Sequence, residues 1–391
     1  MAETPKSWSD IPADLAGLVL GRLCAHADRV RFAAVCPQWR STARQVLLLL
    51  PPPTPLLALK DGGTFYSMPR GEPLRFAGCD EHFATASGSW LVYHRVRCLV
   101  LVDPFSGATM TLPDPSNAHL PDDSDDSDDS DDSEDSYDSK SHFKRIDTQE
   151  FKVMKLIVCS PNLVAALFCS DCCNRIAVCW PGGSMWSVAS ILWITDITFY
   201  QGKLFAVDYL ENLLALNISM DDKTGDLQVS QIGPVIKVNH FDNLKTFNRV
   251  LYLVESRGNL LLVRRLIHYR HTVARGQIHT FAGQCEPELA VFKADFGRSR
   301  WDRVMNLEDD QALFLGPCSR AVCLPQYDSP GNRIWFLDDY KGYYYPLEDI
   351  STFGTSGMPN RKFSSPLPMI SWGGCGGPAD YVGAVWLFPS N

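Results

Sequence analysis

The first part of the chain has the spacing of apolar residues that is typical of helices. From Leu15 to Cys24 nearly every side chain is apolar, and only Arg22 carries a charge. On a helix these positions spread over an arc of about 240°, whereas a helix that packs on one core needs a stripe of only about 100°. Pro12 and Asp14 suit the first turn, because that turn needs no proline N–H and favours a carboxylate. The pattern predicts a helix that ends near Cys24 and has two apolar faces to bury.

Two further short helices are predicted after this one. Asp28 is the expected N-cap of the second helix, whose apolar side chains continue to Val35. Pro37 either ends that helix or begins a third, which continues to Val46. Three such helices are too small for a self-sufficient core, so they must pack on the rest of the chain or on a partner.

Beyond Pro51 the pattern changes to that of β-strands. Short stretches rich in Val, Ile, Phe, Tyr and Trp alternate with Gly, Asp, Asn and Pro. A unit of two short strands around a polar turn recurs at 99–113, 175–189, 203–217, 249–265, 289–304 and 333–347. Spacing of about 40–50 residues is typical of four-stranded propeller blades and gives about six or seven blades. We therefore predict an α+β multidomain protein, with a helical module at 5–50 and an all-β propeller at 51–391.

The spacing of these units is not uniform. The units that begin at 175 and 203 lie only 28 residues apart, which fits if one of them is the outer hairpin of a neighbouring blade. The stretch Ala384–Phe388 is expected to close the ring against the first blade. A pair of β-sandwiches is the alternative fold, although it would not require regular spacing.

An acidic repeat interrupts the predicted propeller. Residues 122–138 contain eleven acidic side chains and no basic ones, and without them the formal net charge changes from −9 to +2. The remainder therefore has no general attraction to nucleic acid. We expect 114–142 to be a disordered insertion, because it cannot bury apolar surface. It is a solvated loop, an internal clamp on the basic stretch 264–275, or an acid-directed phosphorylation segment. The candidate phosphorylation sites are Ser124, Ser127, Ser130, Ser133 and Ser136.

Motifs for chemistry are missing from the sequence. It contains no G-x-S-x-G, no phosphate-binding glycine loop and no H-E-x-x-H, so we predict no enzyme, no catalytic residue and no cofactor. A zinc site at Cys169, Cys172, Cys173 and Cys179 is the less favoured interpretation, and reduced thiols are expected. No apolar run approaches the ~20 residues of a membrane span, so we expect a soluble intracellular protein of the cytoplasm or nucleus without membrane partners.

The N-terminal pattern resembles a known module. Ile11 and Pro12 are followed by spaced leucines, and the module ends in Val35-Cys36-x-x-Trp39-Arg40. This arrangement resembles an F-box, and the resemblance implies docking on a Skp-type adaptor and, through it, on a cullin ubiquitin ligase. An ordinary helical subdomain is the alternative. The residues expected to bind the adaptor are Ile11, Pro12, Leu15, Val19, Leu20, Leu23, Val35, Cys36 and Trp39.

The C-terminal part resembles the KIB-type β-propeller domain of plant F-box proteins. The most specific strings are Trp-Asp-Arg-Val with Ala-Leu-Phe-Leu-Gly, within 301–316, and Asn-Arg-Ile-Trp-Phe-Leu-Asp-Asp at 332–339. The resemblance implies a substrate-recognition subunit of a Skp–cullin–F-box ubiquitin ligase, whose propeller holds an unknown substrate protein. The alternatives are an F-box-like scaffold or regulator outside a ligase and, less favoured, a propeller enzyme.

Overall fold

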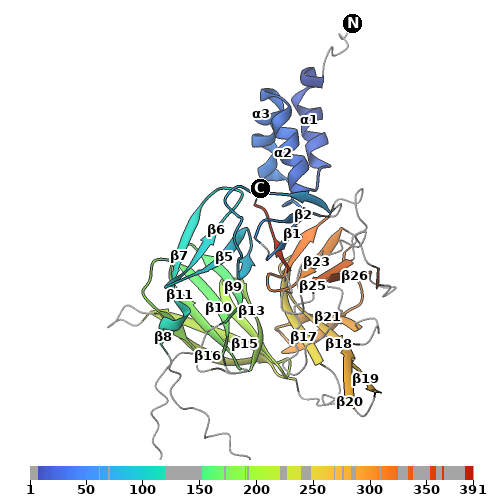
Figure 1. Ribbon diagram of the computed structural model, residues 1–391. Helices are drawn as coiled ribbons and strands as arrows, with labels where there is room; N and C mark the ends of the chain where they lie inside the picture. Colours follow the sequence, from blue (N-terminus) through green and yellow to red (C-terminus); the bar gives the residue numbers. More distant parts are fainter. Residues whose placement is uncertain are drawn as a thin grey trace, which may run out of the picture.

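In the computed structural model three α-helices stand on one side of a ring of β-sheets (Figure 1). The helices are α1 (Ala13–Gly21), α2 (His26–Val35) and α3 (Pro37–Val46), flanked by the 3-10 helices η1 (Trp8–Asp10) and η2 (Leu47–Leu49). The structure describes residues 8–60, 62–68, 71–119, 152–170, 173–189, 191, 193–220, 227–238, 248–267, 269–274, 277–282, 288–308, 310–324, 333–337, 353–357, 363–364 and 384–390.

The boundaries of the helices differ in part from the predicted ones. Helix α1 begins directly after Pro12 and ends at Gly21, three residues before Cys24. Asp28 does not cap α2, so that prediction is wrong. Helix α2 starts two residues earlier, which places Asp28 inside the first turn, where a carboxylate is also favoured by the helix dipole. Pro37 begins α3, and the Cys36 sulfur caps this helix.

The three helices enclose a small core. Its fully buried members are Ala16, Leu20, Phe32 and Ala43. The Trp39 ring stacks on Phe32 with 4.4 Å between ring centroids. Since a core of this size is too small to hold a fold by itself, the module depends on its contacts with the propeller.

Within the described residues the remaining chain forms a six-bladed propeller, which confirms the predicted fold class. From the channel outward, blade 1 contains β28 (Ala384–Leu387), β1 (Leu56–Leu59), β2 (Phe65–Ser67) and β3 (Glu72–Leu74). Blade 2 contains β4 (Thr85–Ser87), β5 (Trp90–Arg95), β6 (Cys98–Val102) and β7 (Thr109–Pro113). Blade 3 contains β9 (Lys152–Ser160), β10 (Leu163–Ser170), β11 (Cys173–Cys179), β12 (Trp186–Val188) and β8 (Ala118–His119).

The other three blades complete the ring. Blade 4 contains β13 (Ile194–Tyr200), β14 (Lys203–Asp208), β15 (Leu213–Met220) and β16 (Leu227–Ile236). Blade 5 contains β17 (Asn248–Ser256), β18 (Asn259–Ile267), β21 (Glu288–Asp295) and β22 (Arg300–Val304), and the hairpin β19 (Tyr269–Ala274) with β20 (Gln277–Ala282) is inserted after β18. Blade 6 contains β24 (Arg320–Cys323), β23 (Gln311–Leu315), β25 (Arg333–Leu337), β26 (Phe353–Gly357) and β27 (Phe363–Ser364).

Burial between neighbouring blades explains the continuous apolar runs of the central strands. Each pair of adjacent blades encloses one cluster of buried apolar side chains. A strand such as β1 or β23 contributes to the clusters on both of its sides, so all of its residues are buried. Such strands therefore show runs of apolar residues rather than strict alternation.

The last strand closes the ring, as predicted for Ala384–Phe388. Strand β28 pairs antiparallel with β1, and Leu387 lies opposite Leu56. The Trp386 side chain is completely buried, and its indole N–H donates to the carbonyl of Leu315 in blade 6 at 2.9 Å. The first and last strands of the described propeller thus pair in blade 1, which packs against blade 6 through Trp386 and Phe388.

The recurring sequence units do not each mark one blade. The unit at 175–189 is the outer hairpin of blade 3, so the short gap before 203 has the expected explanation. The units at 249–265 and 289–304, however, belong to the same blade, which the β19–β20 hairpin lengthens. The spacing of 40 residues between them is therefore not a blade period.

The start of the acidic insertion is also corrected. Residues 114–119 belong to the fold, because they form η3 (Pro115–Asn117) and β8, which pairs parallel with β12. The rest of the predicted insertion, including the five candidate phosphorylation sites, lies outside the described residues.

Truncation at the ring closure tests this account of the fold. A chain that ends at Gly383 lacks four apolar side chains that are 0 to 3% exposed, Val385 to Phe388. At about 1.5–3 kcal/mol for each side chain, the loss is comparable to the whole stability of a domain, about 5–15 kcal/mol. We expect no cooperative thermal unfolding of this variant. A chain that ends at Phe388 is the matched control and should unfold like the full chain; equal behaviour of both truncations would contradict closure by β28.

Candidate functional site

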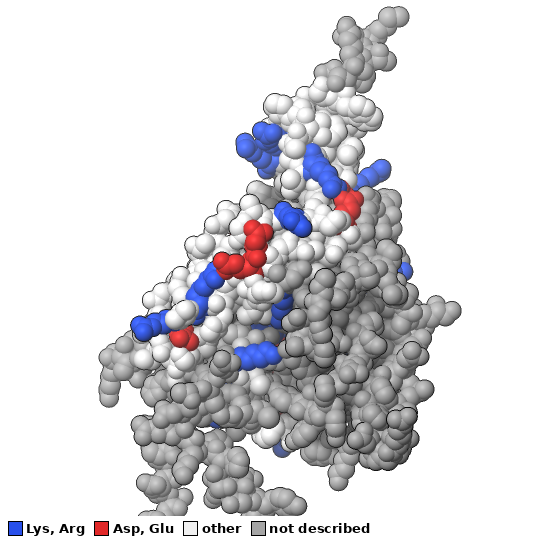
Figure 2. Space-filling view, in the orientation of Figure 1, with Lys and Arg blue, Asp and Glu red and all other residues white. Residues whose placement is uncertain are grey.

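The outer face of α1 is apolar and exposed. Leu15, Leu18 and Val19 are 53%, 67% and 41% exposed, whereas Ala16 and Leu20 on the inner face are fully buried. On the side of the molecule seen in Figure 2, the described surface of the helical module is mainly uncharged, with Lys and Arg side chains at its margins. The two apolar faces predicted for this helix are therefore both present, and within the described chain the outer one is left open to solvent.

The residues predicted to bind the adaptor divide into three groups. Four are exposed, four are partly buried and one is inaccessible. The exposed residues are Pro12, Leu15, Val19 and Val35, and the partly buried ones are Ile11, Leu23, Cys36 and Trp39. Leu20 has no exposed surface, so its place in the predicted contact is corrected: it supports the outer face from inside.

Sequence reasoning left out several exposed apolar residues of the module. Leu18 lies beside the predicted residues of α1 and belongs to the same wide apolar arc, which is the signal that would have included it. Val30, Leu48 and Leu49 are 52%, 80% and 83% exposed. The η2 leucines precede the prolines that end the module, and no periodic pattern distinguishes them from core positions.

The α1–α2 connection and the first residue of α2 hold the module on blades 1 and 2. The Thr54 N–H donates to the carbonyl of Cys24 at 2.8 Å, and the Thr54 hydroxyl donates to the carbonyl of Met68 at 2.7 Å. The His26 ring packs edge-on against Phe105 at 4.7 Å, where β6 turns into β7. Because these contacts join the start of α2 to two different blades, the module has a defined direction relative to the ring.

The junction histidine is partly buried, and its imidazole is neutral near pH 7. The pKa of His26 is lowered from 6.5 to about 4, mainly by burial and in smaller part by the neighbouring Arg29, while Asp103 acts in the opposite direction. A neutral imidazole suits the contact with Phe105, since protonation would place a charge in this apolar position.

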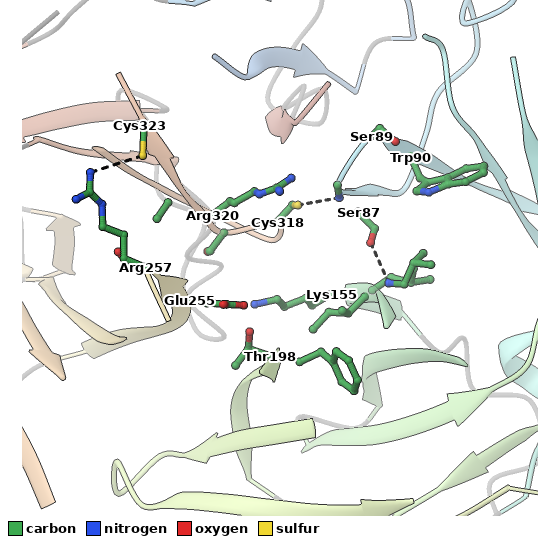
Figure 3. A pocket seen from close by; sticks show the side chains of 18 of the residues that line it. Ser87, Ser89, Trp90, Lys155, Thr198, Glu255, Arg257, Cys318, Arg320 and Cys323 are labelled. Carbon is green, nitrogen blue, oxygen red and sulfur yellow. Dashed lines mark hydrogen bonds between the residues drawn. The ribbon is translucent and has the colours of Figure 1, made fainter. Parts of the chain in front are cut away.

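The second candidate site is the channel at the centre of the propeller. A cavity of about 630 Å³ lies between the inner strands of blades 2 to 6 and has the size of common ligand pockets, about 300–1,000 Å³. Figure 3 shows Lys155, Glu255 and Arg320 directed toward it from three different blades. A smaller cavity of about 240 Å³ adjoins it and shares Ser89 and Arg320.

A buried ion pair connects three blades in the channel wall. The Lys155 ammonium lies 2.7 Å from the Asp196 carboxylate, and both side chains are less than 10% exposed. The second carboxylate oxygen of Asp196 accepts the Leu253 N–H at 2.7 Å. Burial raises the pKa of the Asp196 carboxyl, whereas Lys155 and the two backbone N–H groups that Asp196 accepts favour its ionised form.

The other sequence candidates are not assembled into a chemical site. Cys169 and Cys179 lie opposite Asn174 and Val164 on the β10–β11 ladder, five positions apart. At about 3.3 Å per residue this is about 16 Å, too far for one zinc ion. Cys172 lies outside the described residues, and among those described no group of three metal ligands is present.

The two described arginines of the basic stretch 264–275 already have partners in the fold, so they are not available to bind the acidic segment. Arg264 pairs with the buried Glu211 at 2.8 Å, and Arg265 is buried and donates to the carbonyl of Leu337 at 2.8 Å. Both guanidinium groups therefore hold blade 5 to its neighbours, and the other basic side chains of 264–275 are outside what the structure describes. In the described part of the chain no helix is long and apolar enough to cross a membrane.

A closed ring of blades around a cavity, with a helical module fixed at one end, defines a propeller-based binding protein. The family model described as KIB1-4 beta-propeller matches residues 60–355, so the chain belongs to this family. Propellers of this family are in general non-catalytic binding domains. No curated protein matches the chain.

The burial of His26 predicts a dependence of stability on pH. The unfolded chain binds a proton at His26 below about pH 6.5, whereas the folded chain binds it only below about pH 4. Stability should therefore fall as pH falls through this window, by up to about 3 kcal/mol. Urea unfolding at about pH 7 and about pH 4.5 should show a smaller difference for His26→Phe than for the wild type. His94→Phe is the control, because His94 is exposed. If the stability difference between the two pH values were the same in His26→Phe as in the wild type, the burial of His26 would not be the cause of the pH dependence.

The ion pair of the channel wall gives a second prediction. Lys155→Met leaves the Asp196 carboxylate buried without its counter-charge, which should lower the free energy of unfolding by about 3–5 kcal/mol at neutral pH. Because the folded pKa of Asp196 lies above the unfolded one, the folded state binds more protons, so the variant should regain stability as pH falls toward about 4. The exposed Lys203→Met should change stability by less than about 0.5 kcal/mol. Equal stability of both variants would show that the pair does not connect the blades.

Proposed function

We propose that this chain is the substrate-recognition subunit of a Skp–cullin–F-box ubiquitin ligase. The helical module would dock on a Skp-type adaptor, and the propeller would bind the protein to be ubiquitinated. The observation that carries this proposal is the exposed apolar face of α1, opposite the inner face that packs on the module core. Such a face on a short helix is expected to be covered by a partner.

The family membership supports the same function. KIB1-4 propellers are typical of plant F-box proteins, and here the propeller follows helices that resemble an F-box. The match to the family covers the propeller alone, so the adaptor contact rests on the geometry of the helices and on the Val35-Cys36-x-x-Trp39-Arg40 ending.

The chain would act by positioning rather than by chemistry of its own. A substrate held on the propeller is kept near the conjugating enzyme of the ligase, which raises the effective concentration of its lysines there. The fixed junction of α2 with blades 1 and 2 suits this role, because a rigid connection limits the orientations of the substrate.

Charged substitutions on the outer face test the adaptor contact. Leu15→Glu combined with Leu18→Glu removes two apolar contacts of about 1.5–3 kcal/mol each, so the affinity for a purified plant Skp-type adaptor should fall about 10²- to 10⁴-fold. Isothermal titration or surface plasmon resonance with the full chain measures this change. The melting temperature should remain near that of the wild type, because neither side chain belongs to the module core.

Val96→Glu is the matched control. Val96 is 92% exposed in the β5–β6 turn of blade 2, so the same change from apolar to acidic is made away from the helices. This variant should bind the adaptor like the wild type. Undiminished binding by the Leu15/Leu18 variant, or no binding by the wild type, would contradict the proposed role.

A further inference from the structure

Arg320 occupies a distinct position among the cations of the channel. Of the three that line the large cavity, Lys155 is neutralised by Asp196, and Arg257 lies 2.6 Å from Asp310 and also contacts Glu308. Arg320 forms no ion pair with any described residue; its guanidinium lies over the Phe388 ring, 5.8 Å from the ring centroid. The side chain is exposed, so it offers a positive charge to a ligand that enters the channel.

Glu255 is the corresponding anion on the neighbouring blade 5. It is exposed at the end of β17, lines the same cavity and forms no ion pair within the described part of the chain. Figure 3 shows Arg320 on the β23–β24 hairpin of blade 6 and Glu255 on the adjacent blade 5. The cavity therefore presents one uncommitted positive and one uncommitted negative charge.

The shape of the site favours an extended chain over a compact molecule. The smaller cavity continues from Arg320 along Phe388 and Pro389 to Pro52, at the foot of the helical module. The two cavities share Ser89 and Arg320, and together they are called the cleft. Its other end is lined by Thr198 and Phe199 of blade 4. Trp90 adds apolar surface to the large cavity, and Phe388 and the two prolines add it to the smaller one, as is usual for ligand sites with a few polar anchors.

The cleft is also firmly built. Ser87 accepts the Val158 N–H, and the sulfur of Cys318 accepts the Gly88 N–H at 3.2 Å, so the β4–β5 turn is tied to blades 3 and 6. The Ser319 hydroxyl donates to the Gly316 carbonyl at 2.8 Å and fixes the turn just before Arg320. A preformed site loses less conformational freedom on binding than a loose one.

We propose that this cleft binds an extended segment of a partner protein, with an acidic side chain of that segment at Arg320 and a basic side chain at Glu255. Charge complementarity with these two groups defines the partner. In the ligase proposed above, which this inference extends, the segment would be the substrate's recognition element. The site lies beside the foot of the helical module, so the bound substrate would be held close to the adaptor.

Selection from a random linear peptide library displayed on phage tests the proposal with the full chain as bait. The wild type should enrich peptides that carry Asp or Glu, together with Lys or Arg at a fixed separation. Arg320→Glu should exchange the acidic preference for a basic one and leave the second position unchanged, and Glu255→Lys should do the reverse. A selected peptide, synthesised and titrated, should bind Arg320→Gln about ten- to hundredfold more weakly.

Arg298→Glu is the control, because Arg298 is 70% exposed in the turn before β22 and does not line the cavity. It should leave the selected sequences unchanged. The proposal is overturned if the wild type enriches no acidic residue, if Arg320→Glu keeps the wild-type preference, or if no peptide is selected. Enrichment of Asp-Ser sequences like residues 122–139 would assign the cleft to the chain's own acidic segment and would also overturn it.

The two proposals fail separately. The Leu15/Leu18 variant should select the same peptides as the wild type, because its substitutions lie on the outer face of α1. Loss of the peptide preference with intact adaptor binding removes only the cleft assignment. Peptide selection without any adaptor binding removes the ligase role and leaves the cleft as a protein-binding site.

Discussion

The structure depends on the closure of the ring by β28. Every blade buries apolar side chains against both neighbours, so one missing contact exposes two blade faces. Strand β28, the last described strand, supplies the contact between blades 1 and 6. It pairs with β1, and its Trp386 and the adjacent Phe388 pack among the side chains of blade 6. This closure also puts the helical module, the final strand and the cleft at the same end of the propeller, because the module is joined to β1 by only a few residues.

Two kinds of surface follow from this arrangement. The outer face of α1 is apolar and suits permanent burial against another protein, since exposed clusters of Leu and Val are unfavourable in water. The cleft instead combines apolar walls with single charges, which suits selective and reversible binding. The proposed role needs both kinds of surface, and the junction at Thr54 and His26 keeps them in one orientation.

The sequence predicts the elements better than it predicts their assembly. The apolar helix at 15–21 and the closing strand at 384–388 are readable from the sequence, and the structure confirms both. It also selects one of the two alternatives for Pro37, which begins α3. Asp28 misleads because an acidic residue is favoured both at an N-cap and in a first turn. Leu20 and Leu18 are chemically alike, so only the packing of α2 and α3 decides which of them is buried.

The sequence does not predict which residues line the channel. Lys155 and Asp196 are 41 residues apart on strands of different blades, and Arg320 and Glu255 are separated by a further blade boundary. No local pattern marks such residues, because their proximity arises only when the ring closes. The same holds for the blade count, since the inserted β19–β20 hairpin produces a repeat spacing that resembles a blade period.

The most direct test of the account is hydrogen–deuterium exchange of the full chain with and without a purified plant Skp-type adaptor. The account predicts that the adaptor protects backbone amides of the helical module, most strongly in α1, and leaves the inner strands and the turns around the cleft unchanged. Protection on the propeller blades, or no protection of α1, would contradict the division of the chain into an adaptor-binding module and a substrate-binding propeller.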